Sequence, residues 1–260
     1  MQPNLTILQS WARHAGEILL QGLEQDFHIE HKSEIDLVTD IDRRSEAYLL
    51  QAVQSCCPGD RIIAEESGII RGDDGQVWHI DPLDGTVNYA HGIPFFSVSL
   101  GYVREGQLTL GVVYDPVRDE MFTAERGQGA FLNGNPLRVS TANRLIDSLL
   151  VTGFPYDIQH RADNNLDHYT HFSLHSQGVR RLGSAALDLC YVAAGRFDGF
   201  WEISIESYDI AAGSLIVTEA GGMVTDARGG PDFLTPPCSV LATNGQIHPL
   251  MLDGLWHPSA

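Results

Sequence analysis

The sequence predicts a mixed α/β fold, because segments with helical and with strand periodicity alternate along the chain. Apolar residues recur at helical spacing over residues 5–23. A continuous apolar run at residues 77–80 is typical of a buried strand. Between Phe95 and Val139, short apolar segments are separated by turn signals such as Asn133-Gly134. This last pattern favours an antiparallel meander.

The first third of the chain is expected to bring two strand ends together. Periodicity predicts helices at residues 5–23 and 40–53, and short buried strands at 61–64 and 77–80. Thr39 or Asp40 is a suitable N-cap for the second helix. The polar segment 71–76 contains glycine and is expected to be a loop. It would return the chain so that Glu65 and Asp81 lie at neighbouring strand ends.

The second half is expected to alternate strands with helices. Strands are predicted from Ser148 and over 178–181, 198–204 and 240–243, and helices over 164–177, 185–194 and 210–220. Ser184 would begin one of these helices and Gly195 would end it. Asp209 would lie at the N-terminal end of another. The sequence shows no internal repeat, low-complexity tract or clear linker.

Composition argues against two classes of partner. A formal net charge of −18 disfavours the nucleic-acid backbone and anionic membranes, since both attract clustered Lys and Arg. An anionic substrate would therefore need bound cations. The four cysteines contain no CxxC pair, which favours reduced thiols. With no signal-peptide pattern and no bilayer-length apolar stretch, we expect a soluble, cytoplasmic protein.

The segment at residues 81–86, Asp-Pro-Leu-Asp-Gly-Thr, carries the strongest chemical signal. Asp81 and Asp84 follow a buried strand, and two neighbouring carboxylates favour Mg²⁺ or a similar hard cation. Thr86 and Asn88 favour a helix start, which would leave the N–H groups near Gly85 and Thr86 free to bind an anion. A cation site beside an anion site predicts metal-dependent phosphate chemistry.

Several other residues allow two interpretations from the sequence alone. Asp42 and Asp209 could cap helices, or they could take part in the site near Asp81. Arg180 and Arg181 could form ion pairs with the many acids, or one of them could contact the substrate. Three histidines fall on one face of the helix predicted at 164–177, a spacing that zinc ligands also show, but no carboxylate or cysteine motif accompanies them; they are His168, His171 and His175.

Four segments occur in an order that resembles the inositol monophosphatase family. They are residues 36–42, 64–67, 81–86 and 201–213, and the likeness extends roughly from Lys32 to Asn244. The resemblance implies a layered αβαβα sandwich, a Mg²⁺-dependent phosphomonoesterase activity and a homodimer. It further implies one catalytic unit, with most metal ligands in residues 1–145 and with Asp209 and the substrate contacts in residues 146–260.

The resemblance also implies a role for each matching residue. Two or three Mg²⁺ ions, or Mn²⁺ in their place, would be held by Glu65, Asp81, the Leu83 carbonyl, Asp84 and Asp209. Gly85 and Thr86 would bind phosphate, and Asp42 with Thr86 would orient and deprotonate the attacking water beside Glu65. The alcohol part of the substrate would contact Arg181, Gly183, Ser184, Ala185, Glu202 and Asp209. Metal loss would loosen the site, including a mobile loop near Lys32.

Three positions depart mildly from the family pattern: Ala64, Ser207 and Tyr208. The motifs specify the reaction better than the substrate. Inositol 1-phosphate is the first expectation, supported by Glu202 as an acceptor for hydroxyl groups. Related phosphatases act on 3'-phosphoadenosine 5'-phosphate, fructose 1,6-bisphosphate, NADP or histidinol phosphate. A regulatory or binding subunit, without a primary enzymatic role, is the alternative from another class.

Overall fold

The computed structural model describes residues 2–24, 29–31 and 37–258. Asp36 and the segment near Lys32, which the sequence analysis singled out, lie outside these residues.

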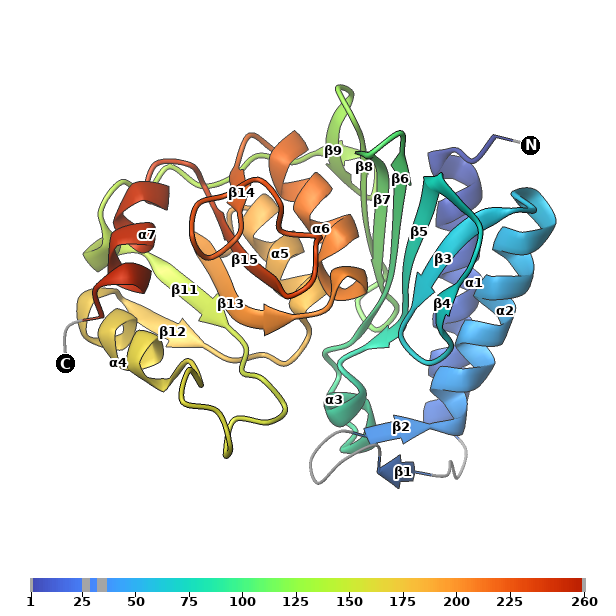
Figure 1. Cartoon of the computed structure of the whole chain (residues 1–260), viewed down its shortest axis with the longest axis horizontal. Helices are drawn as coiled ribbons and strands as arrows, with labels where there is room; N and C mark the ends of the chain where they lie inside the picture. Colours follow the sequence, from blue (N-terminus) through green and yellow to red (C-terminus); the bar gives the residue numbers. More distant parts are fainter. Residues whose placement is uncertain (1, 25–28, 32–36, 259–260) are drawn as a thin grey trace.

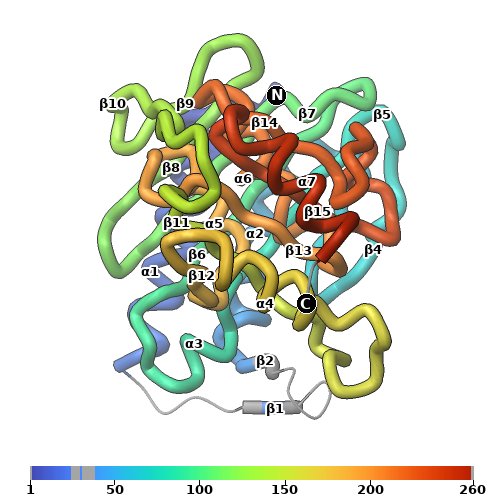
Figure 2. The backbone as a smooth tube through the Cα atoms, turned by 90° about the vertical axis from the view of Figure 1, so that its left-hand side faces the viewer, coloured from blue at the N-terminus to red at the C-terminus, as the bar shows by residue number. Residues whose placement is uncertain are grey.

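Helices and sheets form five layers, which confirms the predicted αβαβα sandwich (Figure 1). One sheet has helices α1 and α2 on its outer face, α5 and α6 lie between the two sheets, and α4 and α7 cover the far face of the second sheet. Figure 2 looks onto that far face, with α4 and α7 in front of the strands. The helices are α1 (Leu5–Leu23), α2 (Asp40–Cys56), α3 (Thr86–Ala90), α4 (Leu166–His175), α5 (Ala185–Ala193), α6 (Ser207–Glu219) and α7 (His248–Trp256), with a 3₁₀ turn η1 (Leu145–Asp147).

The first sheet has eight strands in the order β10-β9-β8-β7-β6-β5-β3-β4. They are β3 (Asp60–Ala64), β4 (Gly68–Ile70), β5 (Asp73–Asp84), β6 (Ser97–Arg104), β7 (Gln107–Asp115), β8 (Glu120–Glu125), β9 (Gly129–Leu132) and β10 (Asn135–Pro136). The run from β5 to β10 is antiparallel, which confirms the predicted meander. The expected loop at 71–76 was partly wrong, because β5 already begins at Asp73 and Gln76 pairs with Arg104.

The second sheet has five strands in the order β12-β11-β13-β15-β14. They are β11 (Leu149–Thr152), β12 (Gly178–Arg180), β13 (Gly199–Ile205), β14 (Met223–Thr225) and β15 (Cys238–Thr243). A separate hairpin pairs β1 (Ile29–His31) with β2 (Leu37–Thr39). The hairpin, β14 and α7 were not predicted from the sequence.

The starts of two helices carry the residues on which the site depends. Thr39 is the N-cap of α2, and its backbone N–H donates to Asp42 Oδ2 (2.8 Å) in a capping box. Helix α6 was expected to begin at Ile210 but begins at Ser207, with Glu206 as its N-cap. Asp209 therefore lies inside the first turn, where its Oδ2 accepts the Glu206 N–H at 3.0 Å.

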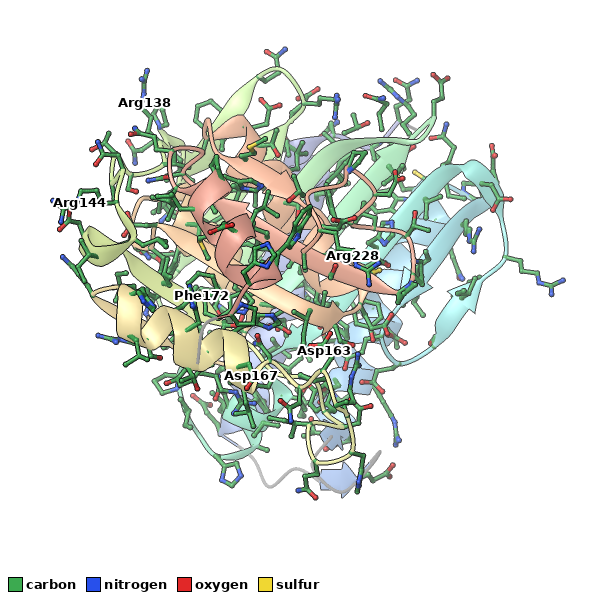
Figure 3. The ribbon with its side chains drawn as sticks, turned by 60° about the vertical axis from the view of Figure 1, so that its left-hand side comes forward. Arg138, Arg144, Asp163, Asp167, Phe172 and Arg228 are labelled. Atoms are coloured by element: carbon green, nitrogen blue, oxygen red, sulfur yellow. The ribbon has the colours of Figure 1, made fainter. Side chains whose placement is uncertain are left out.

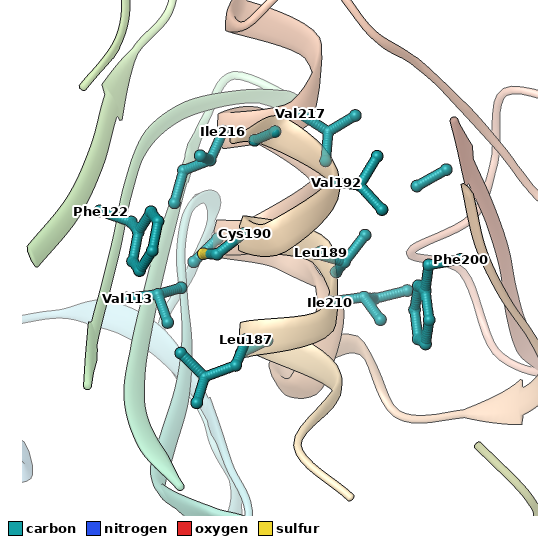
Figure 4. Packing of buried hydrophobic residues seen from close by; sticks show 14 of the residues in the cluster. Val113, Phe122, Leu187, Leu189, Cys190, Val192, Phe200, Ile210, Ile216 and Val217 are labelled. Carbon is teal, nitrogen blue, oxygen red and sulfur yellow. The ribbon is translucent and has the colours of Figure 1, made fainter. Parts of the chain in front are cut away.

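Helix α5 lies at the centre of the main hydrophobic core (Figure 4). Leu187 and Cys190 point towards Val113 and Phe122 of the first sheet, while Val192 lies on the opposite side of the helix. A helix that is apolar on both sides is typical of a buried position between two sheets. This position fixes the N-terminal end of α5 relative to both halves of the chain.

Two glycines let α6 approach the first sheet closely. Gly101 on β6 and Gly111 on β7 are cross-strand partners. A Cβ atom on Gly101 would lie 2.8 Å from the Ala211 Cβ, and one on Gly111 would lie 2.7 Å from the Ala212 carbonyl oxygen. The absence of side chains at these two positions therefore sets the height of α6, and of Asp209, above the sheet.

All four cysteines lie in the described part of the chain, and none of them forms a disulfide, as expected. Among the described residues, no helix combines the length and apolarity needed to cross a membrane. The three histidines of α4 contact neighbouring groups: the rings of His171 and His175 stack with centroids 4.5 Å apart, and His168 Nε2 lies 3.0 Å from the Leu255 carbonyl oxygen.

Burial of His248 predicts a specific pH dependence of stability. Burial lowers the pKa of this imidazole, whose two nitrogens lie 3.0 Å from Thr243 Oγ1 and 3.1 Å from Thr225 Oγ1. Because the unfolded chain then binds the proton more readily, the stabilising contribution is full above about pH 6.5 and is lost as the pH falls below it.

We therefore expect His248→Gln to weaken the fall in unfolding free energy between pH 7 and pH 5, measured by urea denaturation. His257→Gln, at an exposed position of the described chain, is the control. An identical pH dependence in His248→Gln and the wild type would contradict the assignment.

Candidate active site

Three acidic side chains meet where two strands of the first sheet end. Strands β3 and β5 are parallel, with Ala64 opposite Ile80, and the Glu65 N–H donates to the Ile80 carbonyl (3.2 Å). Glu65 and Asp81 therefore lie at neighbouring strand ends, as the sequence predicted, and Asp84 follows within the same strand. The pKa of Asp81 rises through burial first and then through repulsion from Glu65, Asp84 and Asp209.

Asp209 reaches the same place from the other half of the chain. Its pKa is raised by burial and by the charges of Asp84 and Glu65. Glu65, Asp84 and Asp209 line a cleft of about 1090 Å³ between the two halves of the chain, and Asp81 does not line it. Four neighbouring carboxylates without a matching cation repel one another, so the arrangement favours either bound protons or a bound cation.

Hydrogen bonds orient the carboxylates individually. Asp81 Oδ1 accepts the Leu83 N–H (2.9 Å). Asp84 accepts from the Ser184 hydroxyl and from the N–H groups of Ala185 (3.2 Å) and Ala186 (2.9 Å) at the start of α5. In the described part of the chain, no three Asp, Glu, His or Cys side chains are arranged to enclose one ion. The acids are thus close neighbours rather than a closed ligand shell, and their role as ligands stays a prediction.

Asp42 and Thr86 are paired, and Asp42 also caps its helix. Thr86 Oγ1 lies 3.0 Å from both Asp42 Oδ1 and the Leu83 carbonyl oxygen. One hydroxyl proton can be donated fully to only one of these acceptors at a time. Asp42 Oδ2 meanwhile accepts from Thr39. The capping role and the predicted contact with Thr86 are both present, since each uses a different oxygen of the same carboxylate.

Gly85 joins β5 to α3 in a conformation that disfavours other residues. Its φ of 97° is left-handed, and a Cβ atom there would lie 3.1 Å from the carbonyl oxygens of Gly183 and Phe95. Asn88 Nδ2 holds the same region by donating to the carbonyls of Phe95 (2.8 Å) and Leu182 (2.7 Å). These contacts place Gly85 and Thr86 directly beside the turn at Gly183.

The opposite side of the cleft is built by the second half of the chain. Glu202, Arg181 and the turn from Gly183 to Ala185 line it, and their contact with a substrate alcohol stays a prediction. Burial and the charge of Asp84 raise the pKa of Glu202 to about 8, against the lowering effect of Arg181. Arg181 also lies over the Phe154 ring at 5.6 Å from its centroid. Both arginines are exposed, but Arg180 does not line the cleft and donates to the Val179 carbonyl.

Comparison with known proteins identifies the family of the chain. The model of the inositol monophosphatase family matches residues 1–258. The chain belongs to the inositol monophosphatase family. Among its relatives, the Nus factor SuhB of Pseudomonas aeruginosa is 46% identical over 243 residues, covering 90% of this chain and 89% of that protein. The inositol-1-monophosphatase of Mesorhizobium japonicum is 42% identical over 257 residues, 98% of this chain and 96% of that protein.

A solved structure agrees with the assignment. The structure of inositol monophosphatase from Anabaena (Nostoc) matches with a TM-score of 0.89 at 42% identity, covering 98% of this chain and 96% of that one. Inositol monophosphatase family members are generally metal-dependent phosphatases of small substrates.

Two residues of α2 hold the segments that carry the candidate site, and they were not predicted from the sequence. Glu46 is buried and accepts from the Glu66 N–H (2.8 Å) and the Ser67 hydroxyl (2.5 Å), which fixes the turn after Glu65. Ser45 Oγ donates to the Pro82 carbonyl (2.9 Å) between Asp81 and Asp84. An acid on the buried face of an amphipathic helix was the available signal for Glu46.

Gly153 leaves room for the Glu202 carboxylate, and this leads to a mutational prediction. A Cβ atom at Gly153 would lie 1.9 Å from Glu202 Oε1, so Gly153→Ala must displace that carboxylate. The predicted contact of Glu202 with the substrate alcohol would then be lost, so we expect the KM for inositol 1-phosphate to rise about tenfold with a smaller change in kcat. Steady-state kinetics check this, with Gly75→Ala as the control because its Cβ would approach only the Asp73 side chain. An unchanged KM would contradict the role of Glu202.

Proposed function

We propose that this protein is a Mg²⁺-dependent phosphomonoesterase that hydrolyses inositol 1-phosphate or a similar small phosphorylated polyol. The observation that carries the proposal is the convergence of Glu65, Asp81, Asp84 and Asp209 beside the paired Asp42 and Thr86. Mutual repulsion among the acids fits a site for hard cations, which prefer oxygen ligands. Membership of the inositol monophosphatase family supports the same chemistry.

The acids would hold two or three Mg²⁺ ions together with the Leu83 carbonyl oxygen, and Mn²⁺ would be able to replace them. When bound, Mg²⁺ supplies positive charge to the phosphoryl oxygens and makes a nearby water more acidic. No histidine is needed as a base in this scheme.

The chain's own groups would position the reactants. Thr86 Oγ1, held by Asp42, would orient the attacking water, and the Asp42 carboxylate beside Glu65 would take up its proton. The first N–H groups of α3, at Gly85 and Thr86, would donate to a phosphate oxygen, since they have no acceptor within the helix. Glu202 and the turn from Gly183 to Ala185, with Arg181 at its edge, would hold the alcohol.

The decisive experiment is phosphate release from a panel of esters, with Mg²⁺ and with EDTA. The panel contains inositol 1-phosphate, 3'-phosphoadenosine 5'-phosphate, fructose 1,6-bisphosphate, NADP and histidinol phosphate. A Mg²⁺-dependent preference for the inositol ester is the expected result. A preference for histidinol phosphate would overturn the inositol assignment and keep the chemistry. Absence of activity on every ester would overturn the enzymatic proposal.

The name of one relative favours a second function. The 46% identical protein of Pseudomonas aeruginosa is called a Nus factor, so a regulatory partner is the alternative for this chain. Co-purification of a large partner protein that persists in Asp84→Asn would support this role independently of catalysis.

We further propose a homodimer in the cytoplasm, which light scattering and fractionation would test.

A further inference from the structure

Asp188 is an unusual residue for its place in the fold. Helix α5 is buried between the two sheets, and Asp188 is its one charged residue. The side chain is 1% exposed, and its Oδ1 has no hydrogen-bond partner among the described residues. Leaving a buried polar atom unpaired destabilises a fold. Among the residues with such an unpaired atom, Asp188 lines the cleft, where a bound ligand could supply the partner.

Other buried aspartates of the protein show the contrast. Asp115 is fully buried and accepts from the N–H groups of Val117 and Arg118 (3.0 Å each). Asp42 is also fully buried and accepts from Thr39 and Thr86. Both are satisfied within the chain. Asp188 is not, although its place in the first turn of α5 is favourable for a negative charge. The helix dipole does not provide a hydrogen bond, so this placement alone does not satisfy the carboxyl group.

The surroundings of Asp188 indicate where the missing partner would come from. Asp188 lines the cleft together with Ser184, Ala185 and Glu202. Asp84 and Glu202 are the charged groups that raise its pKa after burial. The unsatisfied carboxyl group therefore lies on the wall that would contact the alcohol part of the substrate, one helical turn beyond the Ser184 cap.

We infer that Asp188 hydrogen-bonds a hydroxyl group of the substrate alcohol and, with Glu202, selects polyhydroxylated alcohols over alcohols that lack hydroxyl groups. This inference rests on the proposed function and specifies its substrate class. Two carboxyl groups on one wall match a ligand that carries several hydroxyls, because each hydroxyl can donate one hydrogen bond. An ester without hydroxyls would leave both carboxyl groups unpaired, which strongly disfavours its binding.

The test compares inositol 1-phosphate with cyclohexyl phosphate, which has the same ring without hydroxyls. The measured quantity is the ratio of their kcat/KM values. Asp188→Leu, similar in size but unable to form hydrogen bonds, is expected to lower this ratio by about 10- to 100-fold, chiefly through the KM for the inositol ester. Asp188→Asn keeps an acceptor oxygen and is expected to restore most of the ratio. General damage to the fold would lower both rates together and leave the ratio unchanged.

A matched control is available on the neighbouring helix. Ser214 of α6 is also buried with an unpaired hydroxyl, but it does not line the cleft; Ser214→Ala is expected to keep the ratio within about twofold. Should Asp188→Leu not fold, Asp188→Ala, which adds no bulk, is measured in the same way. An active wild type with an unchanged ratio in these variants overturns the inference alone. A wild type that hydrolyses neither ester, while inactive on the whole panel, overturns the proposed function and this inference with it.

Discussion

Asp84→Asn is expected to lower phosphate release from inositol 1-phosphate by at least about 10³-fold, because loss of this proposed cation ligand would remove several kcal/mol of charge stabilisation. Asp84 is connected to both halves of the cleft, since it follows β5 and accepts hydrogen bonds from the start of α5. Initial rates at saturating Mg²⁺ measure the effect. Circular dichroism and thermal melting establish that the variant is folded.

Asp163→Asn is the matched control for this change. Asp163 is an exposed acid on the segment that leads to α4 (Figure 3), and it does not line the cleft that Asp84 lines. Its replacement removes the same charge from the chain and is expected to change the rate by less than about twofold. Equal activity of the two variants would refute the placement of the active site.

Thr86→Ala is expected to lower kcat by about 10²-fold or more while Mg²⁺ binding changes little. Thr86 Oγ1 contacts Asp42 and the Leu83 carbonyl, so its loss removes the group proposed to orient the water but none of the four carboxylates. The measurements are kcat at saturating Mg²⁺ and the Mg²⁺ concentration at half-maximal rate. Thr86→Ser keeps the hydroxyl and is expected to retain most of the activity. A large shift in the Mg²⁺ requirement of Thr86→Ala would indicate a ligand role instead.

The layered fold and the converging acids could be predicted because they depend on local patterns. Apolar periodicity predicted α1, and the motif at residues 81–86 indicated where a strand ends. The start of β5 was missed because its first residues are polar and pair through their backbones, which apolar periodicity does not detect. The start of α6 was placed too late because Glu206 is not among the favoured N-cap residues, whereas Asp209 is.

Residues that act through distant neighbours could not be predicted in the same way. Glu46 meets the turn after Glu65 because α2 packs against the first sheet, and Gly153 lies against Glu202 because β11 and β13 are neighbouring strands of the second sheet. The sequence indicates that Glu46 is buried, but it does not indicate the partner of either residue. Asp188 does have a signature in the sequence, since it is a single acid in an otherwise apolar helix. Its significance became visible only with the knowledge that its Oδ1 has no hydrogen-bond partner in the described chain.

Gly101 and Gly111, which lie beneath α6, are expected to tolerate no larger side chain, because any side chain there would move a helix that carries a residue of the candidate site. Any side chain at Gly101 or Gly111 would meet the backbone or Cβ atoms of Ala211 and Ala212, and the helix would have to rise from the sheet. Asp209 would rise with it, while Asp81 would stay on β5. Substitutions at these two glycines, which lie outside the cleft, would then inactivate the protein in a mutational screen. The two glycines would be mistaken for catalytic residues. A survey of inactive variants would therefore need to show whether α6 keeps its distance from the first sheet before it assigned either glycine a catalytic role.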